Sequence, residues 1–167
     1  HKALTGIFIF AFATATSYYV AYSYIEPFFK QVAHLANGTI TIALMIYGAA
    51  GMLGSIAFSK LYPLNRYRFV GLTVAALALC LAMLLPAAAS LAATVALCVV
   101  WGMAVTAYNV AMQSEIINIA PPEGTSVAMS IFSGIFNLGI GLGAFAGGSV
   151  CSHLGIRWIG VAGCAVA

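Results

Sequence analysis

The amino-acid sequence predicts an all-α polytopic membrane protein, that is, a bundle of helices that cross a lipid bilayer. Of its 167 residues, 63% are hydrophobic and only 5% are charged, whereas soluble domains are about 45–50% apolar and about 25% charged. So few charged side chains cannot cover a surface in water, and a disordered chain needs the opposite composition. The net charge of +3 is spread between apolar runs, which excludes the basic face of a nucleic-acid-binding protein.

The charged residues divide the chain into segments of membrane length. A helix needs about 20 apolar residues to cross a hydrocarbon core of about 30 Å, and only helices and closed barrels satisfy every backbone group in lipid. The runs are too long and too continuously apolar for the alternating strands of a barrel. We therefore expect one membrane domain over residues 1–167 with five full spans and a truncated sixth, at about 3–25, 39–60, 68–86, 91–113, 125–148 and 156–167.

The ends of the chain and its basic residues suggest how it sits in the membrane. It begins without methionine and stops inside an apolar run, so we expect a fragment of a larger membrane protein. Basic residues collect on the cytoplasmic side of membrane proteins. The expected N-terminus is cytoplasmic, because this places Lys2, Lys60, Arg66 and Arg68 inside and only Lys30 and Arg157 outside.

Polar residues inside the spans are informative because they are costly in lipid and tend to face a cavity or another helix. In the first span, Thr14, Tyr18, Tyr22 and Glu26 follow one another at i,i+4 and share a face. This stripe presents hydroxyls and one carboxylate to a cavity, while Pro27 should end or kink the helix. The alternative for the tyrosines is an aromatic belt at the membrane interface.

The fourth span carries aromatic and amide groups at depth. Trp101 and Tyr108 lie on one stripe, and Asn109 lies on the adjacent one. These groups suit a sugar, because sugar rings stack on aromatic rings while amides hydrogen-bond hydroxyls. The alternative is an interhelical hydrogen bond from Asn109, with Trp101 facing lipid.

The fifth span combines one amide with a glycine series. Asn137 lies near its centre and is a further binding candidate. Gly139, Gly143 and Gly147 repeat every four residues, which is the small-residue face that lets two helices approach closely. A dinucleotide fingerprint is rejected here, because it requires a preceding strand.

Catalytic chemistry has no visible carrier in the sequence. His34 and His153 lie at span ends, so no pair of imidazoles faces the membrane interior for haem. The cysteines lack metal-ligand spacing, and no carboxylate cluster is present for metal-assisted hydrolysis. We expect neither an enzyme nor a metal or cofactor site.

The junction of the second and third spans resembles a loop motif of the major facilitator superfamily, roughly G-x-x-x-D-R-x-G-R-[RK]. The copy is degenerate: Gly54, Lys60, Arg66 and Arg68 stand for its glycine and basic residues, while Ser59 stands where the motif has aspartate and residues 63–65 replace its glycine turn. Residues 137–148 resemble the fifth helix of C-terminal halves in the drug/proton antiporter branch. Residues 22–28 are similar to the seventh helix of bacterial sugar-efflux transporters in that branch.

The resemblance implies that the chain is helices seven to twelve of a twelve-helix transporter in the bacterial inner membrane, completed by an N-terminal six-helix half. Proton-coupled sugar efflux is then expected, with multidrug efflux or nutrient uptake by the same fold as alternatives. A membrane subunit that only packs against a partner remains a third possibility. The expected substrate-binding residues are Tyr18, Tyr22, Trp101, Tyr108, Asn109 and, on helix eleven, Asn137. Glu26 is the candidate for proton coupling; the alternatives are that it is a solvated helix-end charge near Lys30 and that the proton site lies in the N-terminal half.

Overall fold

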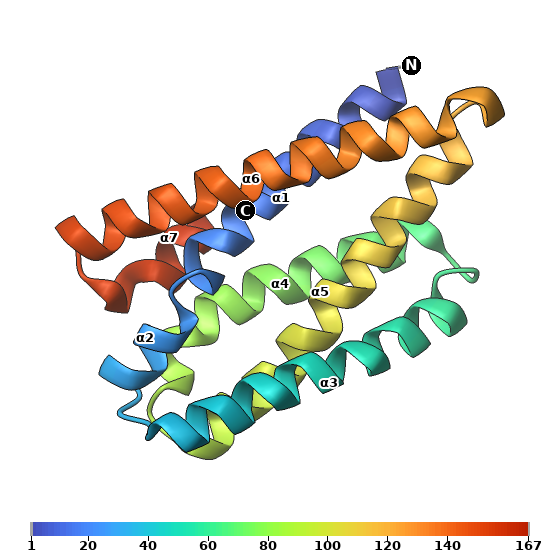
Figure 1. Ribbon diagram of the computed structural model, residues 1–167. Coiled ribbons are helices and arrows are strands. Elements are labelled where there is room, and N and C mark those ends of the chain that lie inside the picture. Colours follow the sequence, from blue (N-terminus) through green and yellow to red (C-terminus); the bar gives the residue numbers. More distant parts are fainter. Residues whose placement is uncertain (1, 167) are drawn as a thin grey trace.

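The computed structural model describes residues 2–166, and helices account for almost all of them, with no strand in that range (Figure 1). Five helical stretches within it are long and apolar enough to cross a membrane. The predicted all-α membrane bundle is therefore confirmed. Its helices are α1 (Lys2–Tyr22), α2 (Ile25–Gln31), α3 (Asn37–Leu61), α4 (Arg66–Ala87), α5 (Leu91–Ile119), α6 (Thr125–His153) and α7 (Ile159–Val166), with short 3-10 turns η1 (Pro122–Gly124) and η2 (Ile156–Trp158).

The first span is interrupted between α1 and α2, one turn before the proline that was expected to interrupt it. Pro27 has no N–H to donate to the carbonyl of Ser23 four residues earlier, and its ring crowds that carbonyl. The helix therefore opens at Ser23, and its hydrogen bonding resumes where the Phe28 amide donates to the Tyr24 carbonyl over 2.9 Å. The first helix thus ends at Tyr22 rather than at the predicted residue 25.

Two helices extend beyond the predicted ends of their spans. α5 continues to Ile119 and α6 to His153, whereas hydropathy placed the ends at 113 and 148. Hydropathy marks where lipid gives way to water, but the backbone hydrogen bonds of a helix continue past that level. α5 stops at Ala120, because a residue before proline favours the extended conformation that Ala120 adopts.

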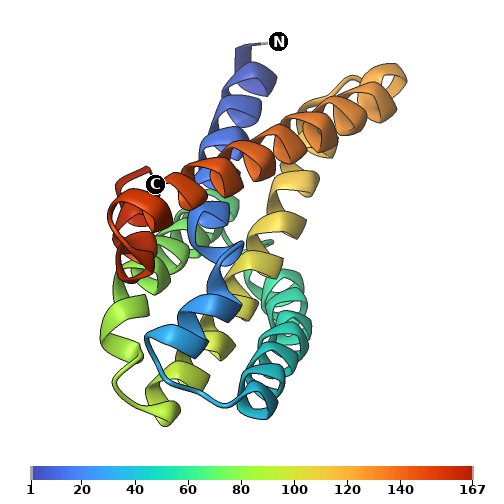
Figure 2. The same ribbon diagram turned by 60° about the vertical axis from the view of Figure 1, so that its left-hand side comes forward.

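The helices associate in two close pairs, α1 with α6 and α3 with α5. α4 packs against α5, and α7 packs against both α1 and α4. Figures 1 and 2 show α6 lying along α1 on one side of the bundle and α3 lying beside α5 on the other. The two pairs enclose the apolar core, to which α4 and α5 contribute most of the large buried side chains and α2 contributes Phe28 and Phe29.

Glycines bring α1 and α6 into backbone contact. A methyl group on Gly143 would lie 2.5 Å from the Thr16 carbonyl oxygen, and one on Gly139 would lie 2.8 Å from the Ala15 methyl. A methyl group on Gly147 would collide with the carbonyl oxygen of Val20. The predicted glycine stripe therefore lies directly on α1.

A second glycine contact joins α3 to α5. A methyl group on Gly102 would collide with the Tyr47 carbonyl, and one on Gly54 with the Met103 carbonyl. The sequence alone did not single out Gly102, because the glycines that pack in the same contact belong to α3 and form no repeat with Gly102 on its own helix. Gly48, which precedes Gly51 and Gly54 in the second span, instead has open space beside it.

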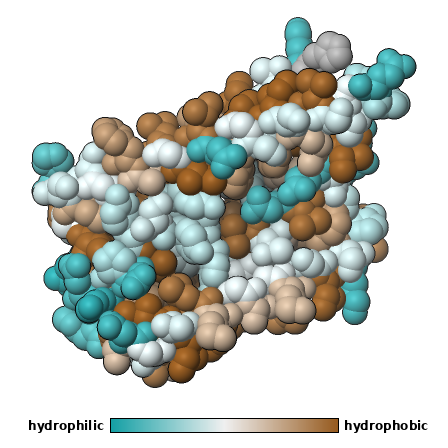
Figure 3. Space-filling view, in the orientation of Figure 1, coloured by the Kyte–Doolittle hydropathy of each residue, from teal (hydrophilic) through white to brown (hydrophobic). Residues whose placement is uncertain are grey.

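The outer surface is that of a membrane protein. Figure 3 shows apolar side chains over the length of the helices, the largest hydrophilic patch at the end where α2 and its connection to α3 lie, and smaller hydrophilic patches at the opposite end and partway along. Large apolar side chains such as Met52, Leu72 and Phe145 are mostly exposed. An exposed apolar surface of this extent requires lipid or another protein segment against it.

Candidate functional site

Four aromatic side chains from three helices meet inside the bundle. Tyr18 and Tyr22 of α1, Tyr47 of α3 and Trp101 of α5 form what we call the aromatic cluster. The three tyrosine rings meet the indole nearly edge-on, with ring centroids 5.7, 6.2 and 6.0 Å from its centre, respectively. Tyr18 and Tyr22 also stack on each other at 5.0 Å. The predicted i,i+4 pair of tyrosines thus faces the predicted tryptophan.

The aromatic cluster has a buried layer and a partly exposed layer. Trp101 and Tyr18 are only 1% and 4% exposed, so neither faces lipid, and neither reaches an open cavity in this conformation. Tyr22 and Tyr47 are half-buried and cover them. The rings within direct reach of a bound molecule are therefore those of Tyr22 and Tyr47, with Tyr18 and Trp101 supporting them.

The polar atoms of the aromatic cluster are unequally satisfied. The hydroxyls of Tyr18 and Tyr47 form a hydrogen bond with each other. The indole Nε1–H of Trp101 is buried and has no hydrogen-bond partner within residues 2–166. A buried donor without an acceptor is costly, so this N–H is a candidate donor to a ligand.

Tyr108 and Asn109 lie about two turns beyond Trp101 along α5 and line a small cavity with Thr14, Tyr18 and Phe136. The cavity measures about 10 Å³, roughly the space of a single water. The Tyr108 hydroxyl is buried beside the Thr14 side chain. The Asn109 side chain donates to the Val105 carbonyl over 2.9 Å. Tyr18 therefore connects this pair to the aromatic cluster.

Two predicted site residues lie apart from this group. Asn137 is exposed on α6 and donates to the Ser133 carbonyl four residues earlier over 2.9 Å. Glu26 is exposed in the first turn of α2 and lines a shallow groove with Asn37 and Thr41. It forms no ion pair with any described residue, Lys30 included.

Tyr47 is the member of the aromatic cluster that sequence reasoning missed. It is a single phenol inside the second span, with no polar residue one turn before or after it on the same face. The sequence signal that could have identified Tyr47 was the energetic cost of placing its hydroxyl in lipid. Tyr47 joins the aromatic cluster because α3 packs closely against α5, where Gly102 lets the Tyr47 backbone approach.

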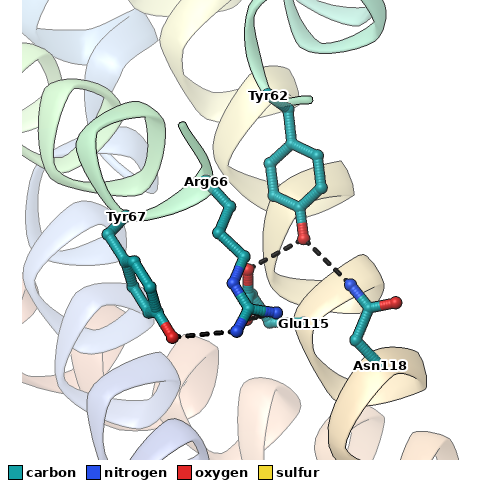
Figure 4. A network of polar contacts seen from close by, with 5 residues as sticks. All are labelled: Tyr62, Arg66, Tyr67, Glu115 and Asn118. Carbon is teal, nitrogen blue, oxygen red and sulfur yellow. Dashed lines mark hydrogen bonds and ion pairs between the residues drawn. The ribbon is translucent and has the colours of Figure 1, made fainter. Parts of the chain in front are cut away.

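A polar network lies at the end of the bundle where α4 begins and α5 ends (Figure 4). The Tyr62 hydroxyl donates to the Glu115 carboxylate over 2.8 Å and accepts from the Asn118 amide over 3.2 Å. Arg66 pairs with Glu115 at 3.7 Å and donates to the Tyr67 hydroxyl over 2.8 Å. The network ties the connection between α3 and α4 to α5.

Glu115 is the centre of this network and was not singled out from the sequence. It is 7% exposed, and a carboxylate so buried requires the donors that Tyr62 and Arg66 supply. Burial and then the neighbouring Glu115 raise the pKa of Tyr62 to about 12. Tyr62 therefore keeps its proton, and remains a donor to Glu115, throughout the physiological pH range.

The other residues of the predicted loop motif have different roles. Gly54 lies on α3 in the contact with α5, while Lys60 and Arg68 are exposed. The side chain of Asn65 caps the first turn of α4 by accepting from the Arg68 amide over 3.0 Å. Of the three basic residues, only Arg66 has an acidic partner in the described chain.

We expect Glu115→Ala to lower the free energy of unfolding by about 1–3 kcal/mol, because the Tyr62 hydroxyl loses a charged acceptor. Glu115→Gln should lose less stability, since its amide oxygen can still accept the hydrogen bond from the Tyr62 hydroxyl. The exposed Glu123 offers a control, and Glu123→Ala should be neutral. Denaturant unfolding in detergent micelles measures all three, and equal stability of Glu115→Ala and Glu123→Ala would show that the network contributes nothing.

Long apolar helices around buried aromatic hydroxyls define a multi-pass membrane protein with a polar interior. The family model of the Major Facilitator Superfamily matches residues 7–167, and the chain belongs to that superfamily. Its members move small molecules across membranes and are transporters rather than enzymes. Membrane transport of a small molecule is therefore the class of activity that the family implies for this chain.

Proposed function

We propose that this chain is the C-terminal half of a twelve-helix exporter that moves a sugar or a related neutral solute by alternating access. The observation that carries the proposal is the aromatic cluster in the interior of the bundle, with an indole N–H that has no partner in the described residues. Transporters of this type rock one half against the other around a midplane site. The partner would be the N-terminal six-helix half.

The chemistry of the cluster favours a sugar. Tyr22 and Tyr47 offer aromatic faces on which the apolar side of a sugar ring can stack. Their hydroxyls and the amide of Asn109 offer donors and acceptors that sugar hydroxyls need, and the buried Trp101 N–H joins them when Tyr22 and Tyr47 move apart during the transport cycle. Asn137, exposed on α6, would join this group from the side that meets the other half.

The distribution of charge favours a neutral substrate. All the ionisable groups of Lys, Arg, Asp and Glu in the described chain lie at helix ends or in connections. A charged drug bound at the aromatic cluster would be buried without a counter-charge from this half, which is costly. Multidrug efflux is therefore the second candidate, and uptake of a nutrient by the same site is the third.

The orientation proposed here has the N-terminus of α1 in the cytoplasm of a bacterium, with the protein in its inner membrane. The start of α1 lies near the start of α4 and the end of α5, since Ala3, Tyr67 and Glu115 line one groove. Lys2, Lys60, Arg66 and Arg68 thus share one end of the bundle, which favours that end as cytoplasmic.

Transport of radiolabelled neutral disaccharide by the complete protein in liposomes tests the proposal. Asn109→Ala should insert normally and weaken binding of the sugar, because one of its polar contacts is removed. Asn118→Ala is the matched control, since this amide lies on the same helix but in the polar network. Equal binding by the wild type and Asn109→Ala would refute a role of Asn109, and transport of an organic cation instead of the sugar would favour the second candidate.

We further propose that proton antiport drives export and that Glu26 carries the proton, because it is a carboxylate exposed beside a groove without an ion pair in the described chain. Glu26→Gln should retain sugar exchange at equal pH and lose at least about tenfold in pH-driven accumulation. Glu123→Gln should change neither. Unchanged accumulation by Glu26→Gln would place the coupling group elsewhere.

A further inference from the structure

A second cavity, of about 780 Å³, lies at the end of the bundle opposite the polar network. It is an open cleft bounded by α2 and its C-terminal connection on one side and by the end of α6 with η2 on the other, and the side chains of Gln31, His34 and Arg157 at its rim are exposed. Figure 1 shows these segments facing each other at the left of the bundle. None of the residues of the aromatic cluster lines it, so this cavity is separate from the proposed transport site.

The backbone around this cavity is shaped in an unusual way. The two residues with left-handed backbone in the described chain are His34, with φ of 53°, and Gly155, with φ of 92°. Both line this cavity. A left-handed conformation is uncommon outside glycine, although histidine adopts it more readily than most residues; here it turns the chain back after α2, and His34 lies at the cavity wall. Unusual backbone of this kind concentrates at functional sites.

The cavity wall carries one cationic side chain and no described carboxylate. Arg157 lines it together with His34 and the Gln31 amide. Arg157 has no acidic partner within residues 2–166. The C-termini of α2 and α6 both lie at this cavity, with partial negative charges of roughly half a unit each, whereas the guanidinium carries a full positive charge on N–H donors that can contact a ligand directly. An anion is therefore the complement of this wall.

We propose that this cavity binds a phosphate group, held by the Arg157 guanidinium and by the side chains of His34 and Gln31. A guanidinium presents paired N–H donors that match two phosphate oxygens, and imidazole and amide N–H groups add further donors. The phosphate belongs either to a lipid headgroup, which lies at the level of helix ends, or to a free phosphorylated solute. Tyr24 and Ile156 give the cavity an apolar side for the rest of that molecule.

Isothermal titration of the complete protein in detergent tests the proposal with two probes, inorganic phosphate and dihexanoyl-phosphatidylglycerol. At least one probe should bind saturably, and Arg157→Gln should weaken it about tenfold or more. Lys30→Gln is the matched control, because Lys30 is a basic residue at the same end that does not line the cavity. Its affinity should stay within about twofold of the wild type.

A second variant guards against a folding defect in Arg157→Gln. His34→Asn keeps a residue that tolerates left-handed backbone and removes the imidazole, so it should weaken the same probe about threefold or more. Saturable binding of inorganic phosphate assigns the cavity to free phosphorylated solutes, and binding of the lipid alone assigns it to headgroups. Absence of binding by both probes, or equal losses in Arg157→Gln and Lys30→Gln, would overturn the proposal.

Discussion

Replacing Gly143 with alanine is expected to destabilise the protein by about 1–3 kcal/mol or more, because the interface between α1 and α6 has no room for a methyl group. That methyl would lie 2.5 Å from the Thr16 carbonyl oxygen and 2.9 Å from the Tyr19 Cβ. The nearest atoms belong to backbone and to the root of a side chain, which cannot move aside without separating the helices. Denaturant unfolding in detergent micelles measures the change.

Gly141→Ala is the control for this prediction. Gly141 lies on the same helix, two residues earlier, with nothing within 4 Å of the added methyl. Alanine is a better helix former than glycine by about 1 kcal/mol, so this variant should be neutral or slightly more stable. Similar losses in both variants would mean that the glycines act through helix propensity and not through packing.

Trp101→Ala is expected to cost about 3–5 kcal/mol of stability, as truncation of a fully buried tryptophan does. The indole supports the rings of Tyr18, Tyr22 and Tyr47, so sugar binding should also be lost where the variant is folded. Trp158 is 50% exposed, and Trp158→Ala should change both quantities little. Unfolding curves and binding titrations on the same preparations measure the two effects.

Trp101→Phe separates binding from packing. It keeps an aromatic ring and removes the N–H that has no acceptor within the described residues, so stability should fall much less than in Trp101→Ala. If the substrate accepts that hydrogen bond, affinity should fall about tenfold, which corresponds to roughly 1.4 kcal/mol. Undiminished affinity of a folded Trp101→Phe would show that the indole only supports the tyrosines.

Periodicity and composition predicted the helical membrane fold and part of the candidate site. Tyr18 and Tyr22 share a face because they are one helical turn apart, and helix geometry alone fixes that relation. The same geometry placed Trp101 and Tyr108 on one stripe, which is the buried face of α5. Relations within a single helix are therefore readable from the sequence.

Relations between helices were not readable in the same way. Tyr47 joins Trp101, and Tyr62 meets Glu115, only because α3 and α5 pack along each other. No spacing within one segment encodes such a pair. The burial of Trp101 beneath Tyr22 and Tyr47 was equally unforeseen, since a helical stripe shows which residues share a face but not which neighbouring helix covers them.

The central claim is that the partly exposed face of the aromatic cluster borders an aqueous pathway. Labelling of Tyr22→Cys by a charged thiosulfonate from water tests it directly, in a background without the native Cys80, Cys98, Cys151 and Cys164. The claim predicts reaction at residue 22 that bound sugar slows, and no reaction of Leu79→Cys on the apolar outer face of α4. Absence of labelling at residue 22, under conditions where an exposed loop cysteine reacts fully, would contradict it.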